Sequence, residues 1–234
     1  MINANALQRK FPEEETSSGN DYANYFIRNG QHIGDYEAMY RNCEDPWNHL
    51  GQKHETLTDR QIAFNWLSRL KRQYSTTRVV EYGCGLGHLT KIIKDLGFSI
   101  VGIDVASSAI ERARDKFTDC VFVQGTLGDQ SNLNLFSPDA VLMAHVTWCC
   151  LDELDMFISN LKAYARMRER PTFLIHLLET YPEGVQKYGV EKFTNMQEIL
   201  AYFNFEYLEY GTVCHPDLTG KDMATTSTYF VAKI

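Results

Sequence analysis

The stretch Val79-Val80-Glu81-Tyr82-Gly83-Cys84-Gly85-Leu86-Gly87-His88-Leu89-Thr90 decides the fold of this chain. Its β-branched start predicts a buried strand, and its three glycines at alternate positions predict a tight turn. Apolar residues at helical spacing then predict a helix: Leu89, Ile92, Ile93 and Leu96. In an α/β sheet, this order presents backbone amides and a helix N-terminus to a nucleotide-like ligand. A turn that serves only chain geometry is the alternative.

Strands and helices alternate on either side of this turn. Short apolar runs predict strands at 78–82, 99–103, 120–123, 140–144 and 172–176, and apolar stripes predict helices after the first, second, fourth and fifth of these strands. Two late runs, 205–213 and 226–233, predict an antiparallel hairpin. The alternation predicts a doubly wound, mostly parallel sheet.

Hydroxyl residues mark three expected helix starts. Thr58 and Gln61 fit a capping box that opens an amphipathic helix over 58–72, and Thr194 with Gln197 fits a second capping box. Ser107 is expected to cap the helix after the strand at 99–103.

The chain before residue 77 differs in composition from the rest. Residues 1–20 are acidic and serine-rich, so we expect a frayed leader. Residues 21–55 are rich in aromatic side chains, and they either pack as a plain N-terminal helix or form a lid over a ligand. We therefore divide the compact unit into a leader with a helical cap, 1–76, and an α/β domain, 77–234.

The glycine spacing argues against a dinucleotide ligand. The dinucleotide fingerprint Gly-x-Gly-x-x-Gly needs a glycine at position 88, where this chain has His88. Glu81 precedes the first glycine, and its carboxylate would repel a pyrophosphate but attract a cation. The pattern Glu-x-Gly-x-Gly-x-Gly resembles the first motif of the class I S-adenosylmethionine-dependent methyltransferases, and the resemblance extends over residues 78–234.

This resemblance implies both a fold and a cofactor. The implied fold is α/β, a doubly wound, mostly parallel seven-stranded sheet in the order 3-2-1-4-5-7-6, with the last strand antiparallel and an N-terminal helical cap. The implied cofactor is S-adenosyl-L-methionine, whose methionine part lies beside the glycine turn while the acid helps to hold its ammonium. The cofactor-binding residues implied here are Glu81, Tyr82, Gly83, Cys84, Gly85 and Gly87.

The next strand ends supply the rest of the expected cofactor site. Asp104 ends the strand at 99–103, where a carboxylate can accept hydrogen bonds from ribose hydroxyls, and Val105 can lie against the purine. Capping of the nearby helix is the alternative role for Asp104. The family usually has an acid near position 126 for the adenine amino group, whereas this chain has Thr126 followed by the usual apolar residue, Leu127. A threonine hydroxyl or a backbone amide can still meet the adenine edge.

Two histidines at strand ends are the candidate catalytic residues. His145 follows the strand at 140–144, which is expected beside the strand at 78–82, so its ring should stand near the cofactor and the transferred methyl group. Methyl transfer depends on alignment, and a hydroxyl acceptor also gains from a base that titrates near neutral pH. His176, which ends the strand at 172–176, is the second candidate, followed by Glu179 and Tyr181 on an expected loop. A structural role is the alternative for both histidines.

Composition and charge argue against several other classes of function. The 234 residues, 44% hydrophobic and 23% charged, suit one globular unit, and a net charge of −7 argues against a nucleic-acid partner. No apolar run reaches the roughly 20 residues of a membrane helix. Without a signal pattern or Cys-x-x-Cys spacing, we expect a cytoplasmic protein. We expect no metal, because metal-ligand spacing is absent, and no hydrolase triad, because Gly-x-Ser-x-Gly is absent.

A narrower likeness concerns the acceptor. Asp45-Pro46-Trp47-Asn48, taken with the glycine stretch, is similar to nodulation-type N-methyltransferases of chitooligosaccharides and to methyltransferases of sugar gene clusters. It implies a small-molecule or saccharide-like acceptor, methylated at oxygen or nitrogen, with a pocket over 181–194 where Tyr188 and Phe193 either stack on sugars or simply pack. We expect a monomer or homodimer.

The alternatives to this function span several classes. They are a methyltransferase for another small metabolite or a protein side chain, a non-catalytic methyltransferase-like binding subunit, and a nicotinamide dehydrogenase, which His88 disfavours.

Overall fold

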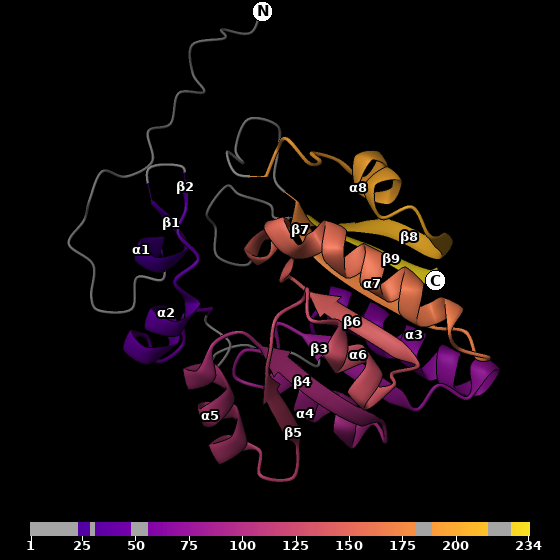
Figure 1. Cartoon of the computed structure of the whole chain (residues 1–234), viewed down its shortest axis with the longest axis horizontal. Helices are drawn as coiled ribbons and strands as arrows, with labels where there is room; N and C mark the ends of the chain where they lie inside the picture. The colour runs from indigo at the N-terminus through magenta and orange to yellow at the C-terminus, as the bar shows by residue number, and fades with distance from the viewer. Residues whose placement is uncertain (1–22, 29–30, 48–55, 181–188, 215–225) are drawn as a thin grey trace, which may run out of the picture.

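A seven-stranded sheet forms the centre of the protein (Figure 1). The computed structural model describes residues 23–28, 31–47, 56–180, 189–214 and 226–234. The strands lie in the order β5-β4-β3-β6-β7-β9-β8, and β9 runs antiparallel to both of its neighbours. Their bounds are β3 Arg78–Tyr82, β4 Ser99–Asp104, β5 Val121–Gln124, β6 Ala140–Ala144, β7 Phe173–Thr180, β8 Glu206–Cys214 and β9 Thr226–Lys233. The expected fold class, strand order and antiparallel last strand are confirmed.

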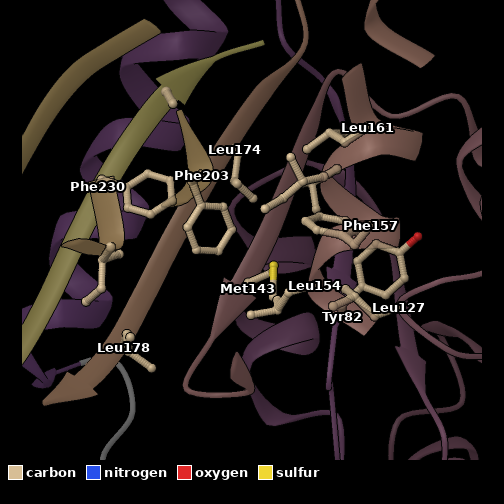
Figure 2. Packing of buried hydrophobic residues seen from close by; sticks show 14 of the residues in the cluster. Tyr82, Leu127, Met143, Leu154, Phe157, Leu161, Leu174, Leu178, Phe203 and Phe230 are labelled. Carbon is tan, nitrogen blue, oxygen red and sulfur yellow. The ribbon is translucent and has the colours of Figure 1, made fainter. Parts of the chain in front are cut away.

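Helices cover both faces of this sheet. On one face, α3 (Thr58–Tyr74) and α4 (His88–Asp95) pack on alternate strand residues such as Val79 and Leu142. On the other face, α6 (Gln130–Phe136), α7 (Leu154–Arg166) and α8 (Met196–Phe203) pack on Val80 and Val141. Neighbouring residues of one strand thus serve opposite cores, as the two-residue period of a strand requires. Figure 2 shows the second core, where Phe157 and Tyr82 meet edge to face.

The register of the central strands brings their carboxyl ends together. Tyr82, which ends β3, pairs with Ile103 of β4 and with Met143 of β6, and all three strands are parallel. The residues that follow these strands therefore lie along one edge of the sheet. β7 continues beyond the expected 172–176 to Thr180, so Glu179 lies in a strand rather than in the expected loop.

The N-terminal segment lies against helix α5 (Ser107–Lys116) (Figure 1). Its elements are α1 (Ala23–Phe26), β1 (Ile27–Arg28), β2 (Gln31–His32) and α2 (Tyr36–Asn42). Two 3₁₀ turns after β6, η2 (Thr147–Cys149) and η3 (Leu151–Glu153), complete the described elements. The expected leader at 1–20 lies outside the described residues, as does Tyr181. Among the described helices, none combines the length and apolarity that a bilayer-spanning segment needs.

All three cap predictions were wrong in detail. Thr58 and Ser107 are the first residues of their helices, and neither helix has a side-chain cap. Ser107 instead donates its hydroxyl hydrogen bond to Glu37 of α2. Asn195 rather than Thr194 caps α8, because its side chain accepts from the backbone N–H of Glu198. A capping motif fixes a helix start only to within a residue, since tertiary contacts compete for the same hydroxyl.

We predict that Phe157→Ala lowers the free energy of unfolding by about 3–5 kcal/mol, because it opens a cavity in the core shown in Figure 2. The measurement is urea unfolding followed by circular dichroism. Leu135→Ala is the control, since Leu135 is 74% exposed and its loss should cost no more than about 0.5 kcal/mol. Equal losses for the two variants would contradict this packing.

Candidate active site

The glycine turn after β3 uses its own amides to bind the neighbouring strand. The backbone N–H groups of Gly83 and Cys84 both donate to the carbonyl of Ile103, and that of Gly85 donates to the carboxylate of Asp104 at 2.9 Å. The expectation that these amides face a ligand is therefore wrong for these three. The turn is instead a glycine-rich stretch of backbone that these hydrogen bonds hold to the end of β4.

Two of the glycines are required by close neighbours. A Cβ on Gly83, whose φ is +71°, would lie 2.3 Å from a methyl carbon of Val146. A Cβ on Gly85, whose φ is +50°, would lie 2.6 Å from the hydroxyl of Tyr40 in α2. Positive φ and lack of space both exclude larger residues here. The turn thus has a geometric role.

Asp104 is buried at the end of β4 and connects two loops. One carboxylate oxygen accepts from Gly85, and the other accepts from the backbone N–H of Ala106 at 3.0 Å. Burial raises the pKa of this carboxyl, and the backbone hydrogen bonds oppose that rise. The capping alternative is thus partly correct, because Ala106 is the residue before α5. A carboxylate has about four lone-pair sites, so acceptor capacity is left for further donors.

The other expected cofactor residues divide into two groups. Val105 is 45% exposed beside Asp104, and Thr126 is exposed after β5. In contrast, the side chains of Tyr82, Cys84 and Leu127 are buried in the cores. Figure 2 shows Leu127 and Tyr82 together beneath α7. The latter three residues can therefore reach a ligand at this edge only through their backbone.

His145 lies at this edge in a constrained conformation. Its φ is +59°, a left-handed conformation that is uncommon for a residue with a side chain, and its N–H donates to the carbonyl of Leu177 in β7. Its Nε2 lies 2.5 Å from Oδ2 of Asp59, in the first turn of α3. Its Nδ1 is buried, has no hydrogen-bond partner among the described residues and lies 3.9 Å from Oε1 of Glu179.

Asp59 acts as the anionic partner of this histidine. Burial alone would raise the pKa of Asp59, but the hydrogen bond from His145 and the positive charge of Arg60 hold it well below its usual range. An ionised carboxylate only accepts hydrogen bonds, so His145 Nε2 is the donor of this pair. The proton-accepting lone pair of the neutral ring is then on Nδ1.

Glu81 and Arg60 are two buried charged residues of the site. Glu81 accepts a 2.5 Å hydrogen bond from the hydroxyl of Thr90 in α4. Burial raises the pKa of Glu81 to about 7, against the opposing effects of Thr90 and of the Arg60 charge. Arg60 is also buried and lines a small cavity together with Glu81 and Gly83.

His176 lies in a different environment from His145. It is fully buried, stacked on Phe230 at 4.6 Å, and its Nε2 lies 2.7 Å from the hydroxyl of Thr147. Burial lowers the pKa of His176 to about 3, so its ring is neutral. The structure does not bring it together with the polar residues at the sheet edge, and its catalytic role stays a prediction.

The N-terminal helix α2 covers the glycine turn. Tyr40 and Met39 pack on Leu86 of the turn and on Ala106 before α5. Glu37 accepts hydrogen bonds from both Ser107 and Ser108, and the bonds from Ser108 lower the pKa of this carboxyl to about 2. This contact of α2 with the turn is compatible with both interpretations of the aromatic segment, packing and lid. That the segment opens for a ligand stays a prediction.

The expected acceptor pocket over 181–194 is only partly described. Phe193 is buried and packs on Trp148 with ring centroids 5.3 Å apart, so its role here is packing. Tyr188 lies outside the described residues.

Three residues of the site were not predicted from sequence: Asp59, Arg60 and Tyr40. A signal existed for the first two. Because Ala63 belongs to the buried stripe of α3, the residues three and four positions earlier share its face, and these are Arg60 and Asp59. Two charged residues on a buried helix face indicate a polar site.

We predict that Glu81→Gln stabilises the protein at pH 8 but not at pH 5. The folded-state pKa near 7 exceeds the ordinary value of 4.5, so the folded state binds the extra proton, and stability is lost as pH rises through 7. Removing the charge should raise the free energy of unfolding at pH 8 by about 1–3 kcal/mol.

Urea unfolding at pH 5, 6, 7 and 8 measures this difference, with the exposed Glu111→Gln as the control. A Glu81→Gln protein that is less stable than the wild type at pH 8 would show that the Glu81 anion stabilises the fold through Arg60.

Comparison with known proteins bears on the family and on the fold. Residues 80–167 match the family model described as a methyltransferase domain. No curated protein matches the sequence. The S-adenosylmethionine-dependent methyltransferase from Anabaena variabilis ATCC 29413 has a similar structure, with 16% identity, a TM-score of 0.58, and coverage of 87% of this chain and 95% of that chain.

Other solved structures share this fold. The [4+2]-cyclase SpnF has 13% identity and a TM-score of 0.53, and the match covers 74% of this chain and 81% of that chain. A protein described for the conversion of a disulfide bond into a thioacetal group during echinomycin biosynthesis has 15% identity and a TM-score of 0.52, with coverage of 73% and 80%. At such identities, these structures establish the fold alone.

The narrower likeness to nodulation-type and sugar methyltransferases stays a prediction. The general resemblance is confirmed by the matched sequence and by the strand order. Residues 80–167 thus match a methyltransferase domain, and the chain has the strand order of the class I methyltransferase fold.

Proposed function

We propose that the protein transfers the methyl group of S-adenosylmethionine to an oxygen or nitrogen atom of a small-molecule or saccharide-like acceptor. The observation that carries the proposal is the buried carboxylate of Asp104, hydrogen-bonded to the glycine turn at adjacent strand ends. It puts an acid with spare lone pairs beside the glycine turn, which Tyr40 of α2 covers, next to the exposed Val105. This combination suits ribose hydroxyls next to an adenine face.

The described residues fit the cofactor with one departure. Asp104 would hold the ribose, Val105 the purine, and Glu81 with the glycine turn the amino-acid end, whereas Thr126 replaces the acid that the family usually has at the adenine edge. When bound, the cofactor supplies a methyl group on a positively charged sulfur. The buried anions Asp59, Glu81 and Asp104 give this edge a negative charge that favours such a cation.

His145 is our candidate for the acceptor side. Its Nε2 donates to Asp59, which leaves Nδ1 to take a proton from an acceptor hydroxyl or amine. Glu179, whose side chain is 44% exposed, lies 3.9 Å from Nδ1 and would stabilise the protonated ring. Because Nδ1 is buried, an acceptor reaches it only after neighbouring side chains move.

Two further functions deserve the same tests. A methyltransferase for another metabolite or a protein side chain would use the same cofactor residues with a different acceptor. Another reaction on this fold is favoured by one finding, the similarity of the fold to a [4+2]-cyclase. A non-catalytic binding subunit, which this finding does not favour, would bind the cofactor without turnover.

We predict that the protein binds S-adenosylhomocysteine at about one site per chain in calorimetric titration, and that Asp104→Ala weakens this binding at least tenfold, because about 1.5–3 kcal/mol is typical for hydrogen bonds to a charged group. Asp115→Ala is the control, an exposed acid on α5. Wild-type protein that is folded and does not bind would refute the proposed function.

We predict that Asp59→Asn lowers the rate constant for methyl transfer at least tenfold with the affinity for S-adenosylhomocysteine unchanged, because an amide no longer fixes the ring tautomer. The assay is release of S-adenosylhomocysteine with amino sugars, oligosaccharides and small metabolites. Full turnover by both Asp59→Asn and His145→Ala would exclude the pair from catalysis.

A further inference from the structure

Arg60 is a buried cation, and part of its hydrogen-bonding capacity is not used by the described residues. The residue is 6% exposed, and its Nε and Nη1 have no hydrogen-bond partner among the described residues. Buried guanidinium donors without partners are costly, and such groups usually face a ligand or water. Burial lowers the pKa of Arg60, while nearby Asp59, Glu81 and Glu179 raise it.

Arg60 lies at the wall of a small cavity. The residue lines a cavity of about 20 Å³, together with Glu81, Gly83, Cys84, His88, Leu89 and Ala144. This cavity therefore lies against the start of the glycine turn, between α3, α4 and the carboxyl ends of β3 and β6. It holds about one water molecule, so a larger group enters only if the lining opens.

The chemistry of this cavity is that of a receptor for a zwitterion. Arg60 presents a planar fork of donors that matches a carboxylate, and Glu81 presents an acceptor that matches an ammonium. Both side chains are buried and line the same cavity. An amino-acid group, which carries one carboxylate and one ammonium on the same carbon, would satisfy both.

We infer that Arg60 binds the carboxylate of the methyl donor and makes the protein selective for donors that keep this carboxylate. The inference rests on the proposed function, since it assumes that the donor is S-adenosylmethionine. It assigns a specificity role: the decarboxylated donor, which retains the adenosine, the sulfonium and the amine, is rejected because Arg60 then stays unpaired in its cavity.

A competing role for Arg60 is that of a counter-ion. Its charge is attracted by Asp59, Glu81 and Glu179, so it can stabilise the fold without touching a ligand. The two roles differ in their effect on binding. A counter-ion affects every ligand of the site alike, whereas a carboxylate receptor affects only ligands that have a carboxylate.

The experiment is calorimetric titration of the full chain with S-adenosylhomocysteine and with its decarboxylated analogue. Wild-type protein should bind S-adenosylhomocysteine at least tenfold more tightly than the analogue. Arg60→Gln should weaken S-adenosylhomocysteine binding about 10- to 100-fold and leave the affinity for the analogue within about twofold. Arg72→Gln, an exposed arginine on the same helix, should change neither affinity.

Three results would overturn the inference. If the wild-type protein binds both ligands with equal affinity, it has no carboxylate receptor. This comparison needs no variant. An Arg60→Gln protein that loses both affinities equally assigns the counter-ion role, and one that loses neither assigns no role in binding. If Arg60→Gln does not fold, Arg60→Lys keeps the charge without the fork, and it should lose affinity for S-adenosylhomocysteine alone. A folded wild type that binds neither ligand refutes the proposed function itself.

Discussion

Parallel pairing of β3 with both β4 and β6 is the constraint on which the rest of the site depends. The register that places Tyr82 beside Ile103 and Met143 ends the three strands at one edge. Asp104 and His145, which are far apart in the chain, then flank the glycine turn. The hydrogen bond from Gly85 to Asp104 fixes the turn to β4, and the N–H of His145 is held by β7. Backbone pairing of the strands therefore brings the residues of the site together, and side-chain contacts such as that of Asp104 fix the turn.

The burial of charged side chains at this site costs free energy. Asp59, Arg60, Glu81 and Asp104 are all buried within or just after elements that meet at this edge. The raised pKa of Glu81, and the Arg60 nitrogens that have no partner among the described residues, indicate that these charges are compensated incompletely there. Groups that remain costly in a folded protein occur most often where a ligand supplies the missing partner. Stability and ligand binding are then expected to oppose each other here, as they do at many functional sites.

Proteins that share this fold do not all catalyse the same reaction. The sheet order is shared with a methyltransferase and also with a [4+2]-cyclase, so the architecture alone does not decide the reaction. The contacts on which our proposal for the reaction relies are the pair of Asp59 with His145 and the cover that α2 forms over the turn. Each of these contacts has one partner in the chain before residue 77, outside the segment that matches the methyltransferase family model.

The sequence by itself determined the alternation of strands and helices, the glycine turn, and the places of Asp104 and His145, because strand period and glycine conformation are local properties. It did not show the helix α6, whose single buried leucine, Leu133, leaves no periodic stripe, or the residues that cap the helices. Only the tertiary structure decided that Asp59 meets His145 across 86 positions of sequence, and that Arg60 is buried beside Glu81. Such contacts depend on how α3 packs against the sheet, and no local pattern encodes that packing.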